Sequence, residues 1–146
     1  MASIKVQSRL KHLKLVSRIT RISAAHISGE TDFDRMPTFG ALEAMAQLAT
    51  LHVRHCQEFG CHAFLVKVNR SRWPAQDALT GCYRLSASLG SHGSNAFAYQ
   101  VKAEGPAGLI LNADVLIGTK PYDGDFKEDI LKAHYRELFR KLLLDR

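Results

Sequence analysis

The amino-acid sequence predicts a single α+β domain, in which an antiparallel β-sheet wraps around a long central helix and an amphipathic helix follows at the C-terminus. Between residues 37 and 59, apolar residues recur three and four positions apart, which is the spacing of one helix face. Around this segment, runs rich in β-branched and aromatic residues alternate with polar ones, as half-buried strands do. A chain of 146 residues, 46% of them hydrophobic, has the size of one domain. We expect residues 1–120 to form the sheet and helix, and residues 121–146 to be a helical extension of the same domain.

The first strands are predicted between Leu13 and Phe33. This segment is rich in β-branched residues: Val16, Ile19, Thr20, Ile22 and Ile27. It predicts either one long strand or two paired strands that bend near Ser23 and Ala24.

The central helix is predicted from Pro37 to about Phe59. Its apolar face consists of Phe39, Leu42, Met45, Ala46, Ala49, Val53 and Cys56. Pro37 suits a first-turn position, where its missing amide hydrogen costs nothing, and Gly60 suits a C-terminal stop that needs a left-handed residue.

Further strands are predicted after the helix, at residues 63–73, 79–89, 95–104 and 107–119. Short turns separate these runs, so neighbouring strands should be antiparallel. The tail from Asp125 to Arg146 carries a capping pattern, Asp125 followed by Glu128, and apolar residues at helical spacing. We expect a second helix that packs on the sheet or on a neighbouring subunit.

The composition favours a soluble protein of the cytoplasm. The N-terminal residues are charged throughout and lack the apolar core of a secretory signal, and no stretch is long enough to span a membrane. The three cysteines are an odd, small number for a disulfide framework, so we expect free thiols. The formal net charge of +6 favours acidic partners.

Two other classes of function have weaker support. A nucleic-acid-binding surface needs basic residues interleaved with stacking aromatics, and the only local cluster of that kind is Lys67, Arg70, Arg72 and Trp73, which also suits the outward face of a strand. A zinc site could draw on His52, His55, Cys56, Cys61 and His62, but their spacing matches no zinc pattern. We expect no metal, no nucleic acid and no membrane partner.

The helix start resembles a known family. From Met36 to Gln47 it runs Met-Pro-Thr-Phe-Gly-Ala-Leu-Glu-Ala-Met-Ala-Gln. This run is similar to the helix start of the 3-hydroxyacyl-(acyl-carrier-protein) dehydratases, whose pattern is Met-Pro-Gly, a few apolar residues, then Glu-Ala-Met-Ala-Gln. A weaker similarity follows in the stretch from Phe64 to Asp77. The resemblance implies a hotdog fold, in which the sheet wraps around the helix, with Glu43 in the place of the family's catalytic carboxylate.

The resemblance also implies a substrate and an assembly. The substrate would be an acyl group carried on the phosphopantetheine of acyl carrier protein or coenzyme A, with no other cofactor. Pro37, Thr38, Phe39 and Gly40 would line the substrate site, and Arg70 and Arg72 would contact the carrier. Because the family's tunnel is shared between two subunits, we expect a homodimer or a larger even assembly, or else a heteromeric partner subunit.

The chain departs from the family in two ways. The family's loop Gly-His-Phe-Pro-Gly-x-Pro, whose histidine is the catalytic base, is missing between Gly29 and Met36. The glycine after the helix-start proline, whose amide the resemblance places on the thioester carbonyl, is Thr38 here; a backbone amide survives that substitution.

Dehydration of a 3-hydroxyacyl thioester requires an acid, a base and donors to the thioester oxygen. The helix start offers amide donors, Glu43 offers the acid, and Gln47, one turn further on, could hold Glu43 or a water.

His26 is the one histidine near the family's position that could act as a relocated base. Without a base, Glu43 beside the amides is the arrangement of a thioesterase. A third reading is a non-catalytic acyl-binding partner subunit.

Overall fold

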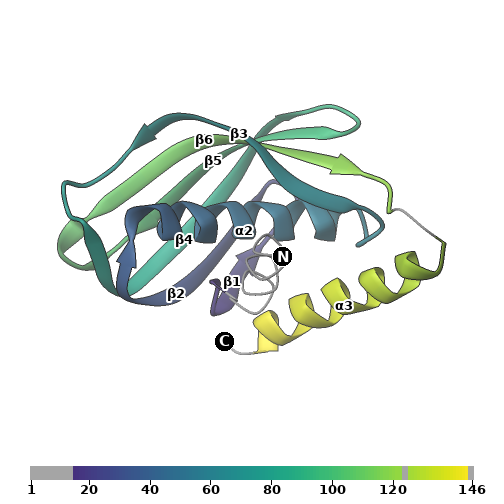
Figure 1. Ribbon diagram of the computed structural model, residues 1–146, viewed down its shortest axis with the longest axis horizontal. Helices are drawn as coiled ribbons and strands as arrows, with labels where there is room; N and C mark the ends of the chain where they lie inside the picture. Colours follow the sequence, from purple (N-terminus) through teal and green to yellow (C-terminus); the bar gives the residue numbers. More distant parts are fainter. Residues whose placement is uncertain (1–14, 123–124, 145–146) are drawn as a thin grey trace, which may run out of the picture.

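The computed structural model describes residues 15–122 and 125–144 (Figure 1). Its elements, in chain order, are β1 (Arg18–Ile22), β2 (His26–Pro37), α2 (Thr38–Cys56), β3 (His62–Arg72), β4 (Ala78–His92), β5 (Ala96–Glu104), the 3₁₀ turn η1 (Pro106–Gly108), β6 (Ile110–Lys120) and α3 (Asp125–Leu144). In this part of the chain, neither α2 nor α3 is long and apolar enough to cross a membrane.

The strands form one antiparallel sheet in the order β1-β2-β4-β5-β6-β3, and α2 lies along its inner face (Figure 1). The predicted sheet around a central helix is therefore present. The first predicted segment is two paired strands, which turn at residues 23–25, as one of the two expected arrangements requires. The last strand begins at Ile110 rather than at Ala107, because Ala107 adopts a positive φ of 61° inside η1.

The core lies between α2 and the sheet. On α2, Ala41, Met45, Leu48 and Ala49 are fully buried. The strands contribute the alternate residues that face the helix, among them Ile27 and Phe33 of β2 and Val115 and Ile117 of β6. Burial of this apolar surface holds the helix in the concave side of the sheet.

The two ends of α2 differ from the sequence-based expectation. Pro37 is the N-cap residue and still pairs with Ala78 of β4, so the helix proper starts at Thr38. The helix ends at Cys56, and the left-handed residues after it are Glu58 and Phe59, with φ of 55° and 61°, not Gly60. The Phe59 ring is buried against Phe139 of α3, and this packing offsets the cost of a left-handed phenylalanine.

The C-terminal helix α3 is present as predicted and packs against β1 and the end of α2. The His55 ring stacks on Phe139 with ring centroids 4.9 Å apart, and Leu142 is fully buried. The Asp125 side chain of the expected capping pair lies outside the described side chains.

Candidate functional site

The start of α2 lies at one end of the domain, beside the end of β2, the start of β4 and the loop after β3 (Figure 1). Pro37 and Phe39 are exposed there, and the Phe39 ring is 69% accessible. Gly40 is buried beneath the Met36 side chain, whose sulfur would lie 2.2 Å from a Cβ added at this position.

No side chain among the described residues caps this helix start, and its first turn holds no acidic residue. The first amide N–H groups of a helix have no partner within the helix and carry the positive end of its dipole. Thr38, which is half-buried, is the first helical residue. The helix start is thus able to receive a ligand oxygen.

Glu43 lies in the second turn of α2 and is half-buried. Two residues correspond to about 200° of helical rotation. Glu43 is two positions from both Ala41 and Met45, which face the sheet, so its side chain leaves α2 on the side away from its own sheet. Within the described residues, no hydrogen bond or ion pair engages the Glu43 carboxylate.

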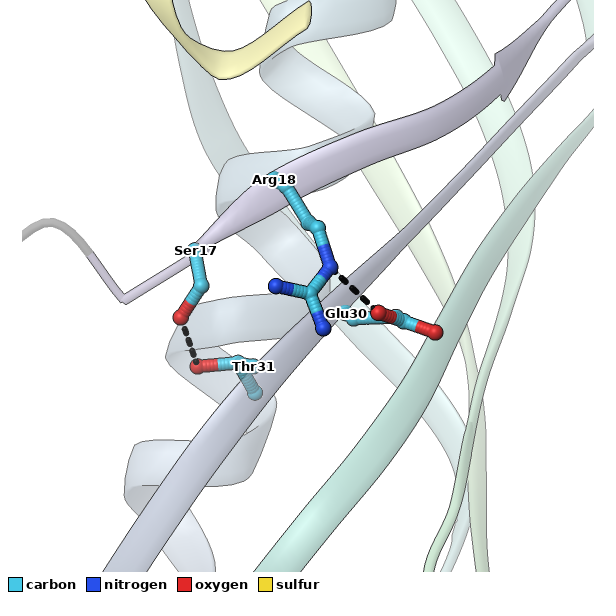
Figure 2. Close-up of polar contacts among 4 residues, drawn as sticks. All are labelled: Ser17, Arg18, Glu30 and Thr31. Atoms are coloured by element: carbon cyan, nitrogen blue, oxygen red, sulfur yellow. Dashed lines mark hydrogen bonds and ion pairs between the residues drawn. The ribbon is translucent and has the colours of Figure 1, made fainter. Parts of the chain in front are cut away.

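Gln47 holds the segment that precedes β1. Its Oε1 accepts a hydrogen bond of 3.2 Å from the Leu15 amide. The same segment is tied to β2, because Thr31 donates to the Leu15 carbonyl and the Ser17 hydroxyl lies 3.5 Å from that of Thr31 (Figure 2). Gln47 therefore fixes the chain beside α2, one turn from Glu43. That Gln47 also holds Glu43 or a water stays a prediction.

His26 begins β2 at the other end of the domain. Its neighbour Ile27 is buried beneath α2, whereas the His26 ring lies on the opposite, outer face, with Nδ1 3.0 Å from Ser88 Oγ and Nε2 2.7 Å from Ser28 Oγ. The strand from His26 to Pro37 is about 36 Å long by its rise per residue. The structure does not bring His26 to Glu43, which corrects the expectation of a relocated base. Strand alternation alone could not decide which face His26 occupies.

Arg70 and Arg72 end the edge strand β3 and are exposed. The pairing of β3 with β6 is interrupted between Asn69 and Arg72, where Arg70 has a φ of 50°. The Arg70 guanidinium lies 3.9 Å from the Asp114 carboxylate, at a solvent-exposed site where such a pair holds it weakly. The end of β3, to which both residues belong, lies at the same end of the domain as the start of α2 (Figure 1).

Sequence reasoning placed His52 in a possible metal cluster, but the structure gives it another role. The ring is fully buried, with Nδ1 2.6 Å from the Tyr99 hydroxyl and Nε2 2.9 Å from the Ser23 carbonyl. No group of three His, Cys, Asp or Glu side chains in the described part of the chain is placed to hold a metal ion.

Solved structures share this architecture. A mutant of the thioesterase PA1618 from Pseudomonas aeruginosa is 12% identical, with a TM-score of 0.63 over 82% of this chain and 94% of its own. The dehydratase heterocomplex ApeI:P from Xenorhabdus doucetiae is 14% identical, with a TM-score of 0.60 over 80% and 86%. The thioesterase HI1161 from Haemophilus influenzae is 12% identical, with a TM-score of 0.60 over 73% and 79%. No protein-family model and no curated protein matches the chain. At these identities the likeness shows the fold, which is the hotdog fold.

Proposed function

We propose that this hotdog domain binds an acyl thioester, carried on acyl carrier protein or coenzyme A, and hydrolyses it with Glu43 as the base. The observation that carries the proposal is the Glu43 carboxylate, which is half-buried, has no partner among the described residues and follows an uncapped helix start by one turn. Its fold counterparts include proteins described as thioesterases and a dehydratase heterocomplex.

The proposed step uses the groups at the start of α2. Glu43 takes a proton from water as the water oxygen bonds to the thioester carbonyl carbon. The negative charge that develops on the carbonyl oxygen is stabilised by amides of the first helical turn. The carbon–sulfur bond then breaks, and the thiolate leaves with the proton that Glu43 holds, so that a carboxylic acid and a free thiol are formed.

Hydrolysis is favoured over dehydration because His26 is not available at Glu43. It lies on the outer face of the sheet, where two serine hydroxyls engage both of its ring nitrogens. A dehydratase would need a base from elsewhere, such as a partner subunit.

The proposal includes a second subunit. Because Glu43 leaves α2 on the side away from its own sheet, a second chain can supply a wall of the acyl site there. We expect a homodimer or a larger even assembly. A heteromeric partner is the second candidate, supported by the fold shared with a dehydratase heterocomplex. Light scattering that shows a monomer at micromolar concentration would contradict both.

The test is thiol release from saturated acyl-coenzyme A and from acylated carrier protein. Glu43→Gln keeps the size of the side chain but cannot accept a proton, so we expect turnover to fall by about 10²- to 10⁴-fold. The melting temperature should stay the same, because no hydrogen bond or ion pair engages the Glu43 side chain within the described residues. Glu128→Gln, an exposed carboxylate on α3, is the matched control and should keep full activity.

Three other results would change the assignment. If Glu43→Gln hydrolyses the thioester normally, Glu43 is not the base. If the chain instead dehydrates 3-hydroxyacyl thioesters and His26→Ala abolishes that activity, the dehydratase reading holds. If the protein shows neither activity yet retains an acyl ligand, it is a binding subunit.

A further inference from the structure

The outer face of the sheet, opposite α2, carries a histidine between two serines. His26 Nδ1 lies 3.0 Å from Ser88 Oγ, and His26 Nε2 lies 2.7 Å from Ser28 Oγ. His26 of β2 pairs with Ser88 of β4, and Ser28 follows His26 by two positions on β2. Residues that pair across two strands, or that are two apart on one strand, point to the same face of a sheet. The strands themselves therefore hold the imidazole beside both hydroxyls.

The two serines differ in their access to solvent. Ser88 is exposed, whereas Ser28 is half-buried. A neutral imidazole has one nitrogen that donates and one that accepts. When Nε2 donates to the Ser28 hydroxyl, Nδ1 is left to accept the hydrogen of the Ser88 hydroxyl. The row then consists of a nucleophile, a base and a group that orients the base.

A hollow of about 490 Å³ includes Ser88 in its lining. This volume is typical of sites for small molecules. Ala98 and Leu116, which are half-buried and pair across β5 and β6, give the hollow apolar surface. The hollow therefore has room for the acyl part of a small ester next to the Ser88 hydroxyl.

Gln100 can supply a hydrogen-bond donor to an ester at Ser88. It pairs with Ser88 across β4 and β5 and lines the same hollow. The Cβ atoms of such paired residues are about 5 Å apart. Gln100 is exposed, and within the described residues no hydrogen bond engages its side chain. Its amide can therefore stabilise the negative charge that develops on an ester carbonyl oxygen.

We propose that Ser88 is the nucleophile of a second hydrolytic site for small carboxylic esters, with His26 as its base and Ser28 as a positioning residue. Ser88 Oγ bonds to the ester carbonyl carbon as its proton passes to His26 Nδ1. The bond from this carbon to the alcohol oxygen breaks, and His26 gives the proton to that oxygen. An alcohol leaves, and the acyl group stays on Ser88. Water then releases the acid by the same proton transfers, which restores Ser88 and His26.

The charges around the hollow favour a neutral or acidic ester over a cationic one. The Asp114 carboxylate lies 3.9 Å from the Arg70 guanidinium. The Glu104 carboxylate lies 3.2 Å from the Lys102 ammonium and 3.6 Å from the Arg84 guanidinium. Each carboxylate thus already faces a cation. Lys67, which lines the hollow, has no ion pair within the described residues, so the surroundings of Ser88 are positive on balance.

This site is separate from Glu43. The Glu43 side chain leaves α2 on the side away from the sheet, whereas Ser88 lies on the outer face of the sheet. The sheet and α2 therefore stand between an ester at Ser88 and the Glu43 carboxylate. The inference does not rest on the proposed thioester hydrolysis.

The experiment is the reaction of the full chain with p-nitrophenyl acetate. We expect a burst of nitrophenolate and an acetyl group on the peptide that contains Ser88, detected by mass spectrometry after acid quenching. Ser88→Ala should lose both. In His26→Gln the side chain is too weak a base to take the proton, so the burst rate should fall by about 10²-fold or more. Ser86→Ala, which removes another hydroxyl of β4 from the same face, is the matched control and should react like the unsubstituted chain.

The positioning role of Ser28 is tested by two variants. Ser28→Ala removes the hydroxyl that orients the imidazole and should slow the burst. Ser28→Thr keeps a hydroxyl and should restore the rate of the unsubstituted chain. Equal rates for Ser28→Ala and the unsubstituted chain, or equal losses in both variants, would overturn this role.

Two results contradict the nucleophile itself. Acetyl groups spread over lysines and Ser86 as well as Ser88 would show non-specific acylation. A burst that Ser88→Ala keeps and His26→Gln loses would make the imidazole the nucleophile. Thermal unfolding shows whether each variant is folded, and should His26→Gln not fold, Ser88→Ala and the acetylated peptide decide. The acetylated peptide reports on Ser88 and thiol release reports on Glu43, so the two proposals fail separately.

Discussion

The imidazole of His52 lies 2.6 Å from the hydroxyl of Tyr99, and both side chains are buried in the core. Nε2 of His52 lies 2.9 Å from the Ser23 carbonyl, which can only accept, so Nε2 carries the ring hydrogen. Nδ1 then accepts from the Tyr99 hydroxyl. This neutral pair joins the end of α2 to β5 and to the turn between β1 and β2.

The free energy of unfolding should depend on pH through His52. Burial is the main cause that lowers the pKa of His52 in the folded protein, and the nearby His55 and His26 lower it further. The neutral ring therefore contributes stability that is present above the ordinary imidazole pKa of about 6.5 and is lost as the pH falls through the lowered pKa. A single proton limits the slope to about 1.4 kcal/mol per pH unit.

Urea unfolding between pH 7.5 and pH 5 measures this slope. We expect His52→Gln to be less stable at pH 7.5 but to have a smaller slope, since its side chain does not titrate. His134→Gln, on the exposed side of α3, should have the slope of the unsubstituted protein. Equal slopes for His52→Gln and the unsubstituted chain would show that His52 does not carry the effect.

Arg54 should be more sensitive to substitution than other arginines of the helices. It is 7% exposed, donates to the carbonyls of Cys61 at 3.3 Å and Ala63 at 3.1 Å, and lies 3.6 Å from the centre of the Tyr135 ring. A lysine cannot reproduce the forked donor, so we expect Arg54→Lys to lose about 1–3 kcal/mol of stability. Arg140→Lys, in an exposed pair with Glu137, should change stability by less than about 0.5 kcal/mol. Chemical denaturation of both variants compares them directly.

Gly29 should not tolerate a side chain. A Cβ there would lie 2.6 Å from the Arg18 carbonyl oxygen and 3.3 Å from a Leu48 methyl group. These close contacts can be relieved only if β1 or α2 moves. Gly29→Ala should therefore lower the free energy of unfolding by about 1–3 kcal/mol. Gly93→Ala, where nothing lies within 4 Å of the added atom, is the control for the same chemical change. If thermal unfolding shows equal stability for the two variants, the close approach of β1 and β2 is not as described.

Arg70 and Arg72 should contribute to binding of the phosphorylated carrier. We expect Arg70→Glu/Arg72→Glu to weaken the affinity for acyl-coenzyme A and for acyl carrier protein, with a larger loss at low salt than at high salt. Arg21→Glu reverses the charge of an exposed cation on the other edge strand and should leave the affinity unchanged, although it alters the net charge by half as much as the double variant. Fluorescence titration at two salt concentrations distinguishes local contact from net charge. If both variants lose the same affinity, Arg70 and Arg72 make no specific contact with the carrier and are solvated residues of the strand.

Much of the fold could be predicted from the sequence because its signals are local. The repeat of apolar residues every three or four positions is a property of neighbouring residues, and it located α2 within a few residues. The alternation in Phe97, Tyr99 and Val101 likewise located β5 and its buried face. The Glu-Ala-Met-Ala-Gln run placed Glu43 in the second turn of α2, since position along a helix follows from residue number alone.

The relationships between distant segments could be decided only by tertiary structure. Whether His26 points toward α2 or away from it depends on the register of β2 against β4, and a shift of one residue reverses every side chain. The left-handed turn falls at Glu58 and Phe59 because α3, more than sixty residues later, covers the Phe59 ring. His52 became a buried partner of Tyr99, 47 positions away, rather than a metal ligand. The sequence alone therefore determined the elements and the position of Glu43, whereas long-range packing determined which side chains meet, because each such contact depends on residues outside any local pattern.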